Sequence, residues 1–554
     1  MKSVLIAAAM AAVILPGAAW AQSAADLARG ASDTKDVMTY GMGYGLQRYS
    51  TLTQINKDSV KHLVPAWNYS LDDSRGEESQ PLVYQGVIYI TTHNATIAVD
   101  AASGKQLWKT KVEYPAETPR VVCCGIVNRG AAIYQGKVFR TTLDANVIAY
   151  DMKTGKELWK SNAIDFKTGY SMTVAPLVAD GVVITGISGA EYGIRGFIDG
   201  WDPETGKHLW RTYTVPAPGE PGSDSWPGDT WMHGGGSAWL TGSFDPDLHT
   251  VYWGIANPGS WNAESRKGDN LYTCGVLALD PQTGKIKWHY QFSPNDPWDY
   301  DGTNELVQAT LAVGGKPTKV IMQANRNAFF YVINRETGKL IAANAFAHQT
   351  WAKGVDLKTG RPIESDTTLA MRKGEKVESY PSALGGKNWE PMSYNPKTGL
   401  AYANTLDMGW TYKAVTPEYR AGVFYFGAEF AFTFTGGPRG FLKAIDPLTG
   451  KAKWQVPADI PRFAGTMTTA GNLVFTGELT GEFEAFDAAN GKKLWQFRTG
   501  SGIVGQPVTW EQNGVQYVAV TSGIGGVYAL FSGDERLSSV PAGGSLWVFA
   551  LAKK

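Results

Sequence analysis

The chain contains 554 residues, and its 51 basic and 51 acidic side chains give a formal net charge of zero at pH 7. This balance argues against nucleic acid as the main partner, because phosphate binding requires a basic face. Three cysteines are too few for a disulfide scaffold in a chain of this length. The 64 glycines, 20 tryptophans and 25 tyrosines are typical of many short strands joined by glycine turns.

The N-terminus has the features of a secretory signal peptide. Lys2 precedes an apolar run over residues 4–15, and Ala19-Trp20-Ala21 is a small-x-small cleavage site. We therefore expect cleavage after Ala21, with residues 1–21 removed and the mature chain exported to a bacterial periplasm. The alternative is an uncleaved membrane anchor. No later stretch approaches the roughly 18 to 20 apolar residues of a membrane span, so none is expected.

A short motif then recurs, with variations: an apolar residue followed by Asp-x-x-Thr-Gly-Lys-x-x-Trp. Its Asp, Gly and Trp positions are Asp100-Gly104-Trp108, Asp151-Gly155-Trp159, Asp202-Gly206-Trp210, Asp280-Gly284-Trp288, Asp446-Gly450-Trp454 and Asp487-Gly491-Trp495, with degenerate copies at Asn334-Gly338 and Asn395-Gly399. The Asp side chain can bond back to backbone N–H groups and Gly supplies positive φ, so each copy is a tight turn between strands. Eight units in this style predict an all-β, eight-bladed β-propeller that forms one domain over residues 22–554. The repeated tryptophans are expected to pack between neighbouring blades.

The spacing of the copies is uneven. The interval from Gly206 to Gly284 is longer than those before it, and a second enlarged interval follows Gly338. Extra residues in repeat proteins form loops, often on the binding face. Four segments break the repeat in ways that packing does not require: residues 78–81, 123–130, 188–191 and 239–302.

Together with the tryptophan repeat, these segments resemble the PQQ-dependent alcohol dehydrogenases over nearly the whole chain, most closely the lanthanide-type methanol dehydrogenases. The resemblance rests on the adjacent Cys123-Cys124, a Gly-Ala-Glu segment ending at Glu191 and a Trp-Asp-Tyr-Asp segment ending at Asp301. It implies that the two cysteines form a disulfide against one face of pyrroloquinoline quinone (PQQ), and that Trp239 stacks on the other face. The alternative for the cysteines is a pair of free buried thiols.

The resemblance implies further contacts to PQQ, which carries three carboxylates. Arg129 is the natural bidentate partner of one carboxylate. Arg326 matches the residue that bonds the quinone oxygen, with a surface ion pair as its alternative role. The other residues expected at the cofactor are Glu78, Thr173, Ser188, Gly189, Ala190, Asn388, Trp389 and Trp495.

The resemblance also implies a metal site in which every ligand is an oxygen atom, supplied by Glu191, Asn257, Asp299 and Asp301. Hard cations such as Ca²⁺ prefer oxygen ligands. Calcium-type relatives typically have a small uncharged residue two places after the catalytic aspartate, where this chain has Asp301. Residues two apart in an extended segment face the same side, and a trivalent ion offsets crowded carboxylates better than a divalent one. We therefore expect a lanthanide, with Ca²⁺ as the alternative metal and a solvated turn as the alternative role of Asp301.

By resemblance, Asp299 is the general base that takes the hydroxyl proton of a small primary alcohol, while the alcohol carbon passes a hydride to C5 of PQQ. Trp261 suggests a tight pocket, so methanol is favoured. No Cys-x-x-Cys-His haem motif is present, so a separate periplasmic cytochrome c is the expected electron acceptor; members of the family often form homodimers. The alternatives are a calcium-dependent ethanol dehydrogenase of the same fold and a non-catalytic propeller scaffold. Cys274 is expected to be a buried small residue.

Overall fold

The computed structural model describes residues 22–434 and 436–552, so the predicted signal peptide lies outside the described residues. Most regular structure in these ranges is β-strand. The three α-helices found there are short: α1 (Ala24–Ala28), α2 (Asp366–Arg372) and α3 (Gly526–Phe531). None of the helices formed by the described ranges has the length and apolar character that a membrane span requires.

The first half of the chain forms four antiparallel sheets, each from four strands in chain order. The strands are β3 (Leu82–Tyr84), β4 (Val87–Thr91), β5 (Ala95–Asp100) and β6 (Gln106–Lys111); β7 (Ala132–Tyr134), β8 (Lys137–Thr141), β9 (Asn146–Asp151) and β10 (Glu157–Asn162); β11 (Leu177–Ala179), β12 (Val182–Gly186), β13 (Phe197–Trp201) and β14 (His208–Tyr213); and β15 (Ser243–Asp245), β16 (Thr250–Ile255), β17 (Gly275–Leu279) and β18 (Ile286–Gln291). Each repeated Asp-x-x-Thr-Gly turn in this half joins the third strand of a sheet to the fourth.

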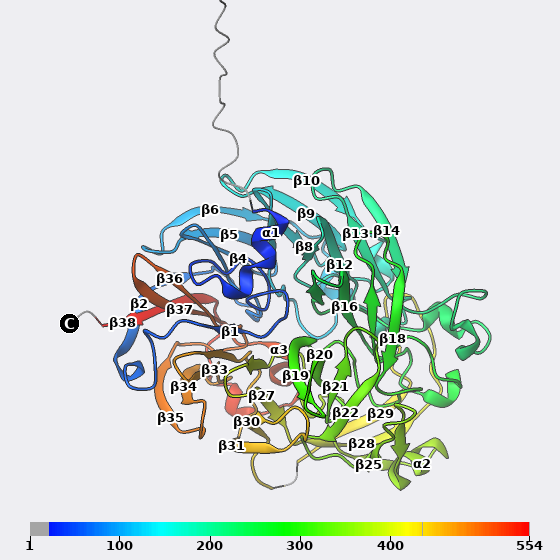
Figure 1. Cartoon of the computed structure of the whole chain (residues 1–554). Helices are drawn as coiled ribbons and strands as arrows, with labels where there is room; N and C mark the ends of the chain where they lie inside the picture. Colours follow the sequence, from blue (N-terminus) through cyan, green and yellow to red (C-terminus); the bar gives the residue numbers. More distant parts are fainter. Residues whose placement is uncertain (1–21, 435, 553–554) are drawn as a thin grey trace, which may run out of the picture.

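The second half forms four further sheets around the same centre. They contain β19 (Val307–Val313), β20 (Lys316–Ala324), β21 (Phe329–Asn334) and β22 (Leu340–Ala345); β26 (Ser393–Asn395), β27 (Leu400–Leu406), β30 (Gly440–Ile445) and β31 (Ala452–Ala458); β32 (Met467–Thr469), β33 (Leu473–Gly477), β34 (Glu482–Asp487) and β35 (Lys493–Arg498), with β1 (Tyr49–Ser50) added; and β36 (Val508–Gln512), β37 (Val515–Ser522) and β38 (Ser545–Leu551), with β2 (Leu63–Ser70) as the outer strand. Figure 1 shows the sheets following one another around a common centre in chain order. This radial arrangement is that of a β-propeller, as the repeats predicted.

The two ends of the chain meet in one sheet. β2 pairs antiparallel with β38, from Leu63 opposite Leu551 to Ser70 opposite Ser545. An N-terminal strand therefore completes a sheet whose other three strands are C-terminal, and this pairing closes the ring (Figure 1).

The repeated tryptophans join neighbouring sheets, as expected. The ring of Trp108, on β6, lies over Gly155 in the turn of the next sheet, and its Nε1 donates to the carbonyl of Met152 at 3.0 Å. Only glycine fits at this position, because a Cβ on residue 155 would lie 2.5 Å from the ring. The same tryptophan-on-glycine contact is made by Trp67 on Gly104, Trp159 on Gly206, Trp210 on Gly284, Trp288 on Gly338 and Trp454 on Gly491.

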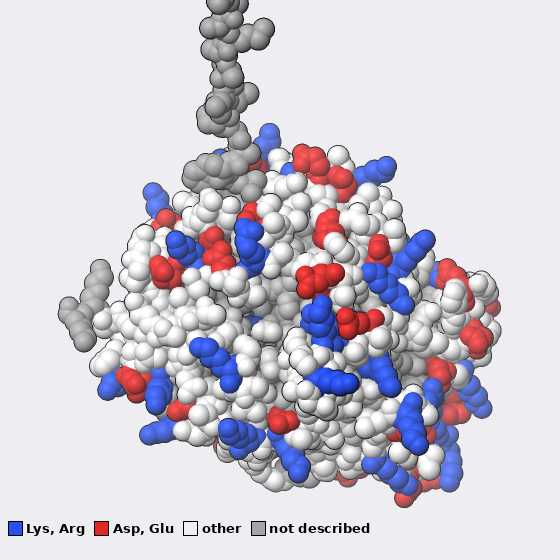
Figure 2. All heavy atoms as spheres, viewed as in Figure 1, with Lys and Arg blue, Asp and Glu red and all other residues white. Residues whose placement is uncertain are grey.

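Two excursions interrupt the regular order. The enlarged interval after Gly338 contains β23 (Ala352–Val355), β24 (Pro362–Glu364), α2 and β25 (Val377–Ser379). β27 pairs directly with β30, so the intervening β28 (Gly409–Ala414) and β29 (Ala428–Thr433) leave their sheet and pair with β25 in a separate three-stranded sheet. On the face shown in Figure 2, positive and negative side chains are interspersed, as the balanced composition suggests.

Candidate active site

One cavity of about 520 Å³ gathers residues from all four segments that break the repeat. Fourteen of the residues predicted at the cofactor or the metal line it: Glu78, Cys123, Cys124, Arg129, Thr173, Ser188, Gly189, Glu191, Trp239, Asp299, Asp301, Arg326, Asn388 and Trp389. These positions span more than 300 residues of sequence, so the propeller itself brings them together.

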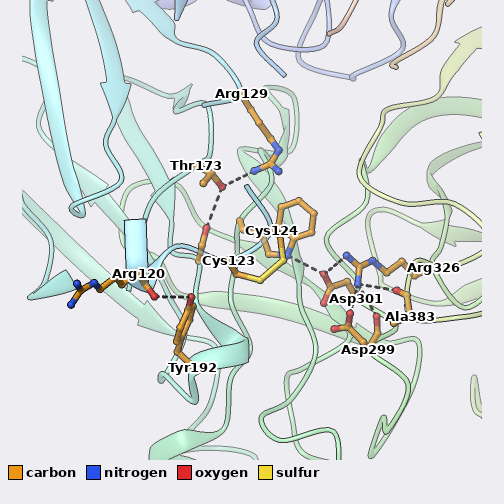
Figure 3. Close-up of a disulfide and its surroundings, with 12 residues drawn as sticks. Arg120, Cys123, Cys124, Arg129, Thr173, Tyr192, Asp299, Asp301, Arg326 and Ala383 are labelled. Carbon is orange, nitrogen blue, oxygen red and sulfur yellow. Dashed lines mark hydrogen bonds and ion pairs between the residues drawn. A yellow bond between two sulfur atoms is a disulfide. The ribbon is translucent and has the colours of Figure 1, made fainter. Parts of the chain in front are cut away.

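The adjacent cysteines lie at the centre of this group. Cys123 and Cys124 form a disulfide with their Cα atoms 3.8 Å apart, and the Cys124 side chain is exposed. Figure 3 shows the disulfide between Arg129 on one side and the pair Asp299 and Arg326 on the other. The sulfur atoms therefore offer an apolar surface between two sets of charged groups.

Arg129 is a buried cation with several partners. Its Nη2 forms an ion pair with Oε2 of Glu78 at 2.8 Å, and its Nη1 donates to Oγ1 of Thr173 at 2.6 Å. Figure 3 shows the bond between Arg129 and Thr173, and the Thr173 and Ser188 hydroxyl oxygens lie 3.3 Å apart, which continues the polar chain. Burial raises the pKa of Glu78, and the positive charge of Arg129 partly offsets that shift.

Two indole rings flank the same guanidinium. The Cζ atom of Arg129 lies 4.7 Å from the ring centroid of Trp239 and 5.0 Å from that of Trp389. Cation–π contacts of this kind hold the arginine in place at low conformational cost. Asn388 is fixed as well, because its Nδ2 donates to the carbonyl of Leu384 at 2.9 Å.

Arg326 organises the acidic side of the cavity. Its Nη1 donates to Oδ2 of Asp299 at 2.8 Å, and its Nη2 lies 3.4 Å from Oδ2 of Asp301 (Figure 3). Asp299 has φ of 66°, a left-handed conformation that is uncommon outside glycine and is found at functional sites. The predicted alternative of a surface ion pair for Arg326 does not apply, since its side chain is only 9% exposed.

The carboxyl groups here are crowded. Burial and the neighbouring Asp301 carboxylate raise the pKa of Glu191 to about 7. Burial also raises the pKa of Asp299 well above its usual range, although Arg326 counteracts the shift. One arginine therefore does not neutralise this cluster, and an additional positive charge would stabilise the ionised forms.

Asp301 is a buried residue with defined partners, so it is not a solvated turn residue. One carboxylate oxygen accepts the backbone N–H of Asn257 at 2.7 Å, and the other accepts Nε1 of Trp239 at 3.0 Å. These bonds link the floor of the cavity, the indole expected at the cofactor and the segment around Asn257 in one rigid unit.

The residues present fit an oxygen-bound hard cation. Among the described residues, Asn257 Oδ1 and Asp299 Oδ1 are buried oxygens without a hydrogen-bond partner, and carboxylate and amide oxygens are the ligands that such cations prefer. Within residues 22–434 and 436–552, no three His, Cys, Asp or Glu side chains already enclose an ion-binding position. The protein therefore offers a partial ligand set, which suits an ion that also takes ligands from a bound cofactor.

The residues of the cavity also fit a flat polyanion. The cavity presents two buried guanidinium groups, of which Arg129 Nε and Arg326 Nε lack a hydrogen-bond partner in the part of the chain that the structure describes. Hydroxyls of Thr173 and Ser188, the disulfide and the Trp239 indole stand in the same space. Arginine pairs and a planar apolar surface are what several carboxylates on an aromatic ring require.

Three predicted residues are not among the described residues that line the cavity. Ala190 is buried next to the lining residue Glu191. Asn257 is also buried, and its backbone N–H is bonded to the lining residue Asp301. Trp495 lies elsewhere: its Nε1 donates to the carbonyl of Leu63 at 2.9 Å and its ring packs on Phe549. Trp495 thus joins two sheets, as the other repeated tryptophans do, and this position differs from the one expected at the cofactor.

Sequence reasoning missed one group of lining residues entirely. Phe424, Phe426, Phe430, Phe432 and Phe434 line the cavity from β29 and its flanks. The alternation of phenylalanine with other residues over this segment is the period-two pattern of a strand, which could have indicated an aromatic face. Val527 and Phe531 of α3 add to the same surface.

The comparisons with known proteins agree with this geometry. The PQQ family model described as "Glucose/ethanol/alcohol dehydrogenase, beta-propeller domain" matches residues 38–345 and 432–518. Quinoprotein alcohol dehydrogenase PedH of Pseudomonas putida is 41% identical, covering 98% of this chain and 96% of its own length. Quinoprotein ethanol dehydrogenase of Pseudomonas aeruginosa is 43% identical, covering 95% and 92%. A solved structure of a europium-containing methanol dehydrogenase has a TM-score of 0.91 and 36% identity, covering 95% of this chain and 100% of its own. The chain therefore belongs to the PQQ-dependent alcohol dehydrogenase family, as its motifs predicted.

Proposed function

We propose that this chain is a periplasmic, PQQ-dependent dehydrogenase that oxidises a small primary alcohol to the aldehyde and passes the electrons to a cytochrome c. The observation that carries the proposal is the convergence of Asp299, Arg326 and the acidic cluster with the Cys123–Cys124 disulfide and Arg129 in one cavity. A scaffold propeller needs the tryptophan contacts but has no need of this arrangement. We interpret the sheets around the ring as eight blades.

The cofactor would be held by the residues around the disulfide. Arg129, Thr173, Ser188 and Arg326 supply donors to its carboxylates and quinone oxygens, while Trp239 and the disulfide supply apolar faces. The chemistry that PQQ would supply when bound is that of a hydride acceptor for the alcohol carbon. Burial raises the pKa of Glu78, which lowers the cost of protonating this carboxyl when an anion binds nearby.

Asp299 is positioned to take the alcohol proton. Arg326 binds its Oδ2, while Oδ1 has no hydrogen-bond partner among the residues described. That free oxygen is the atom that would accept the hydroxyl proton. Arg326 lowers the cost of the ionised carboxylate, but burial still raises the pKa of Asp299, so the positive charge of a metal ion would be needed to favour the form that a general base requires.

The metal ion would be held by Glu191, Asn257, Asp299 and Asp301, and would act as a Lewis acid beside the reacting carbonyl. The crowded, buried carboxyl groups support a strongly charged ion, so we propose a lanthanide. The calcium-dependent form is the alternative, and relatives named for ethanol and methanol support either small alcohol.

The first experiment measures dye-linked alcohol oxidation by PQQ-loaded, metal-stripped protein, reconstituted separately with Ca²⁺ and La³⁺ and assayed with methanol and ethanol. Activity with La³⁺ alone is the expected result. Equal or better activity with Ca²⁺ would show that Asp301 does not select a trivalent ion. Inactivity with both metals and both alcohols would contradict the proposed function and favour a scaffold.

Sedimentation of the purified protein and reduction of a soluble cytochrome c test the remaining proposals. Sedimentation tests whether the chain forms the homodimer that is common in its family, and we expect direct reduction of the cytochrome. N-terminal sequencing of protein recovered from the periplasm should begin at Gln22, because we propose that the signal peptide is cleaved after Ala21.

A further inference from the structure

The loop between β18 and β19 carries a further buried carboxylate behind the proposed base. Asp296 precedes Asp299 by three residues, is 1% exposed and is not among the described residues that line the cavity. It is neither a proposed metal ligand nor a proposed contact of PQQ. Because a buried carboxylate is costly unless it is hydrogen-bonded, the partners of Asp296 indicate its role.

The Asp296 carboxylate accepts two backbone N–H groups, one on either side of the proposed base. Its Oδ2 atom accepts the N–H of Trp298 at 3.1 Å and the N–H of Tyr300 at 3.0 Å. Asp299 stands between these two residues. Hydrogen bonds to a carboxylate are stronger than those between neutral groups, so Asp296 holds the turn that carries Asp299.

The peptide unit between residues 299 and 300 is held at both ends. Its N–H donates to Asp296, and its carbonyl oxygen accepts Nη1 of Arg326 at 2.9 Å (Figure 3). A negative and a positive side chain thus bind opposite ends of one peptide dipole. This peptide cannot rotate without losing two charge-assisted hydrogen bonds in a buried site.

This restraint sets the conformation of Asp299 itself. Its φ of 66° lies in the left-handed region that residues other than glycine seldom adopt, and such a conformation persists only where the surrounding structure holds it. The side chains of Trp298 and Tyr300 lie in the hydrophobic core. Those of Asp299 and Asp301 line the cavity. The orientation of the held peptide therefore decides which side chains reach the cavity.

A buried arginine fixes Asp296 relative to another segment of the site. Arg266 is 1% exposed, and its Nη2 donates to the carbonyl of Asp296. Its Nε donates to the carbonyl of Ser260 at 2.7 Å, three residues after the proposed metal ligand Asn257. The Arg266 guanidinium therefore connects the turn of the proposed base with the segment of Asn257.

We propose that Asp296 is a positioning residue for the base: it accepts the N–H of Tyr300, keeps residue 299 in its left-handed conformation and so holds the Asp299 carboxylate in the cavity. This inference rests on the proposed function, because it takes Asp299 as the base. Without the Asp296 carboxylate, the N–H of Tyr300 would be buried without an acceptor, and the peptide would turn to find one. A displacement of about 1 Å at a reacting group is enough to slow a reaction about 10²-fold.

Kinetics of substituted proteins provide the first test. Asp296→Ala should lower kcat and kcat/KM by the same factor, about 10- to 100-fold, while the near-ultraviolet absorbance of bound PQQ is retained. Asp296→Asn keeps an oxygen that can accept both N–H groups, so its kcat should stay within about threefold of the normal value. Normal kcat in Asp296→Ala, or a loss in Asp296→Asn as large as in Asp296→Ala, would overturn the inference. If Asp296→Ala does not fold, the apolar Asp296→Leu, which is closer in volume, takes its place with the same expectation.

Asp245 supplies a matched control. It is also 1% exposed and outside the described lining of the cavity, and its Oδ1 accepts the N–H groups of Asp247 and Leu248 at 3.0 and 3.1 Å. Its Oδ2 also accepts Nε of Arg335 at 2.6 Å, so Asp245→Ala should destabilise the protein at least as much in guanidinium unfolding. The folded fraction of Asp245→Ala should nevertheless have normal kcat. An equal loss of kcat in Asp245→Ala and Asp296→Ala would overturn the positioning role.

Hydrogen exchange in the cofactor-free protein separates this inference from the proposed function. The amide of Tyr300 should be protected in the unchanged protein and in Asp296→Asn, and should exchange at least about tenfold faster in Asp296→Ala. If the unchanged protein oxidises no alcohol but this amide responds as expected, the proposed chemistry fails and the restraint on residue 299 stands. If alcohols are oxidised but the amide exchanges equally slowly in Asp296→Ala, the positioning role fails alone.

Discussion

Gly155 lies where one sheet docks onto the next. It has φ of 69°, and a Cβ built on it would stand 2.5 Å from Cε3 of Trp108 and 2.9 Å from Oγ1 of Thr110. Gly399 has the same φ, but no described atom beyond its chain neighbours lies within 4 Å of its Cβ position. Alanine at either glycine costs a similar backbone energy of about 1–2 kcal/mol. A comparison of the two variants therefore isolates the contact with Trp108.

The magnitude follows from the contact. Gly155→Ala must displace the Trp108 ring by about 0.9 Å, from 2.5 Å to an ordinary contact of 3.4 Å. Overpacking of this kind costs about 1–3 kcal/mol, and loss of the bond from Trp108 Nε1 to Met152 costs about 1 kcal/mol more. We expect Gly155→Ala to be roughly 2–4 kcal/mol less stable than Gly399→Ala.

Guanidinium unfolding, followed by tryptophan fluorescence and circular dichroism, measures both variants against the unchanged protein. The Gly155→Ala midpoint should lie clearly below that of Gly399→Ala. Coincident midpoints would refute the account in which tryptophan-on-glycine contacts hold neighbouring sheets together.

Three further predictions concern single side chains. Asp299→Asn should lower kcat by about 10²- to 10⁴-fold while the near-ultraviolet absorbance of bound PQQ is retained; near-normal turnover would remove Asp299 as the base. Arg129→Lys should weaken PQQ binding at least about tenfold, as measured by equilibrium dialysis, because an ammonium group cannot bond Glu78, Thr173 and a carboxylate in one plane. Unchanged affinity would mean that the planar arrangement of the guanidinium donors does not contribute to PQQ binding. Burial raises the pKa of Glu390 from 4.5 to about 7, so the folded state binds this proton more tightly and stability should fall as pH rises from about 4.5 to about 7. In urea titrations, Glu390→Gln should make the free energy of unfolding depend less on pH in this range. An unaltered pH dependence would mean that other groups cause it.

The turns and the docking tryptophans could be predicted because they depend on local chemistry. Asp151 accepts the N–H groups of its own turn, and Gly155 has the positive φ that the motif requires. The motif did not identify Trp67, because no Asp-x-x-Thr-Gly turn precedes this residue. Its strand, β2, pairs instead with β38, which is almost 500 residues away in sequence. Asn344 was also missed, although its Nδ2 donates to the carbonyl of Leu448 at 2.9 Å beside Gly450, in place of an absent tryptophan.

The charged residues of the cavity could be predicted from motifs, whereas the place of its aromatic lining could not. Cys123, Arg129 and Asp299 stand in short segments whose composition packing does not explain. The phenylalanines around β29 have an ordinary strand pattern, and only the tertiary structure places them along the cavity. A hydrophobic residue comes to line a cavity through its location in the fold, which its immediate sequence does not encode.

The strand pairing between β2 and β38 affects how the molecule comes apart. In an open array of repeats, the terminal units have one neighbour and fray first. A closed ring has no terminal unit, so each sheet is held from both sides and piecemeal opening must begin by breaking a complete interface. Deleting residues 545–551 would create two frayed ends at once, and native-state hydrogen exchange would then rise in β2 and in β36 and β37 before it rises elsewhere.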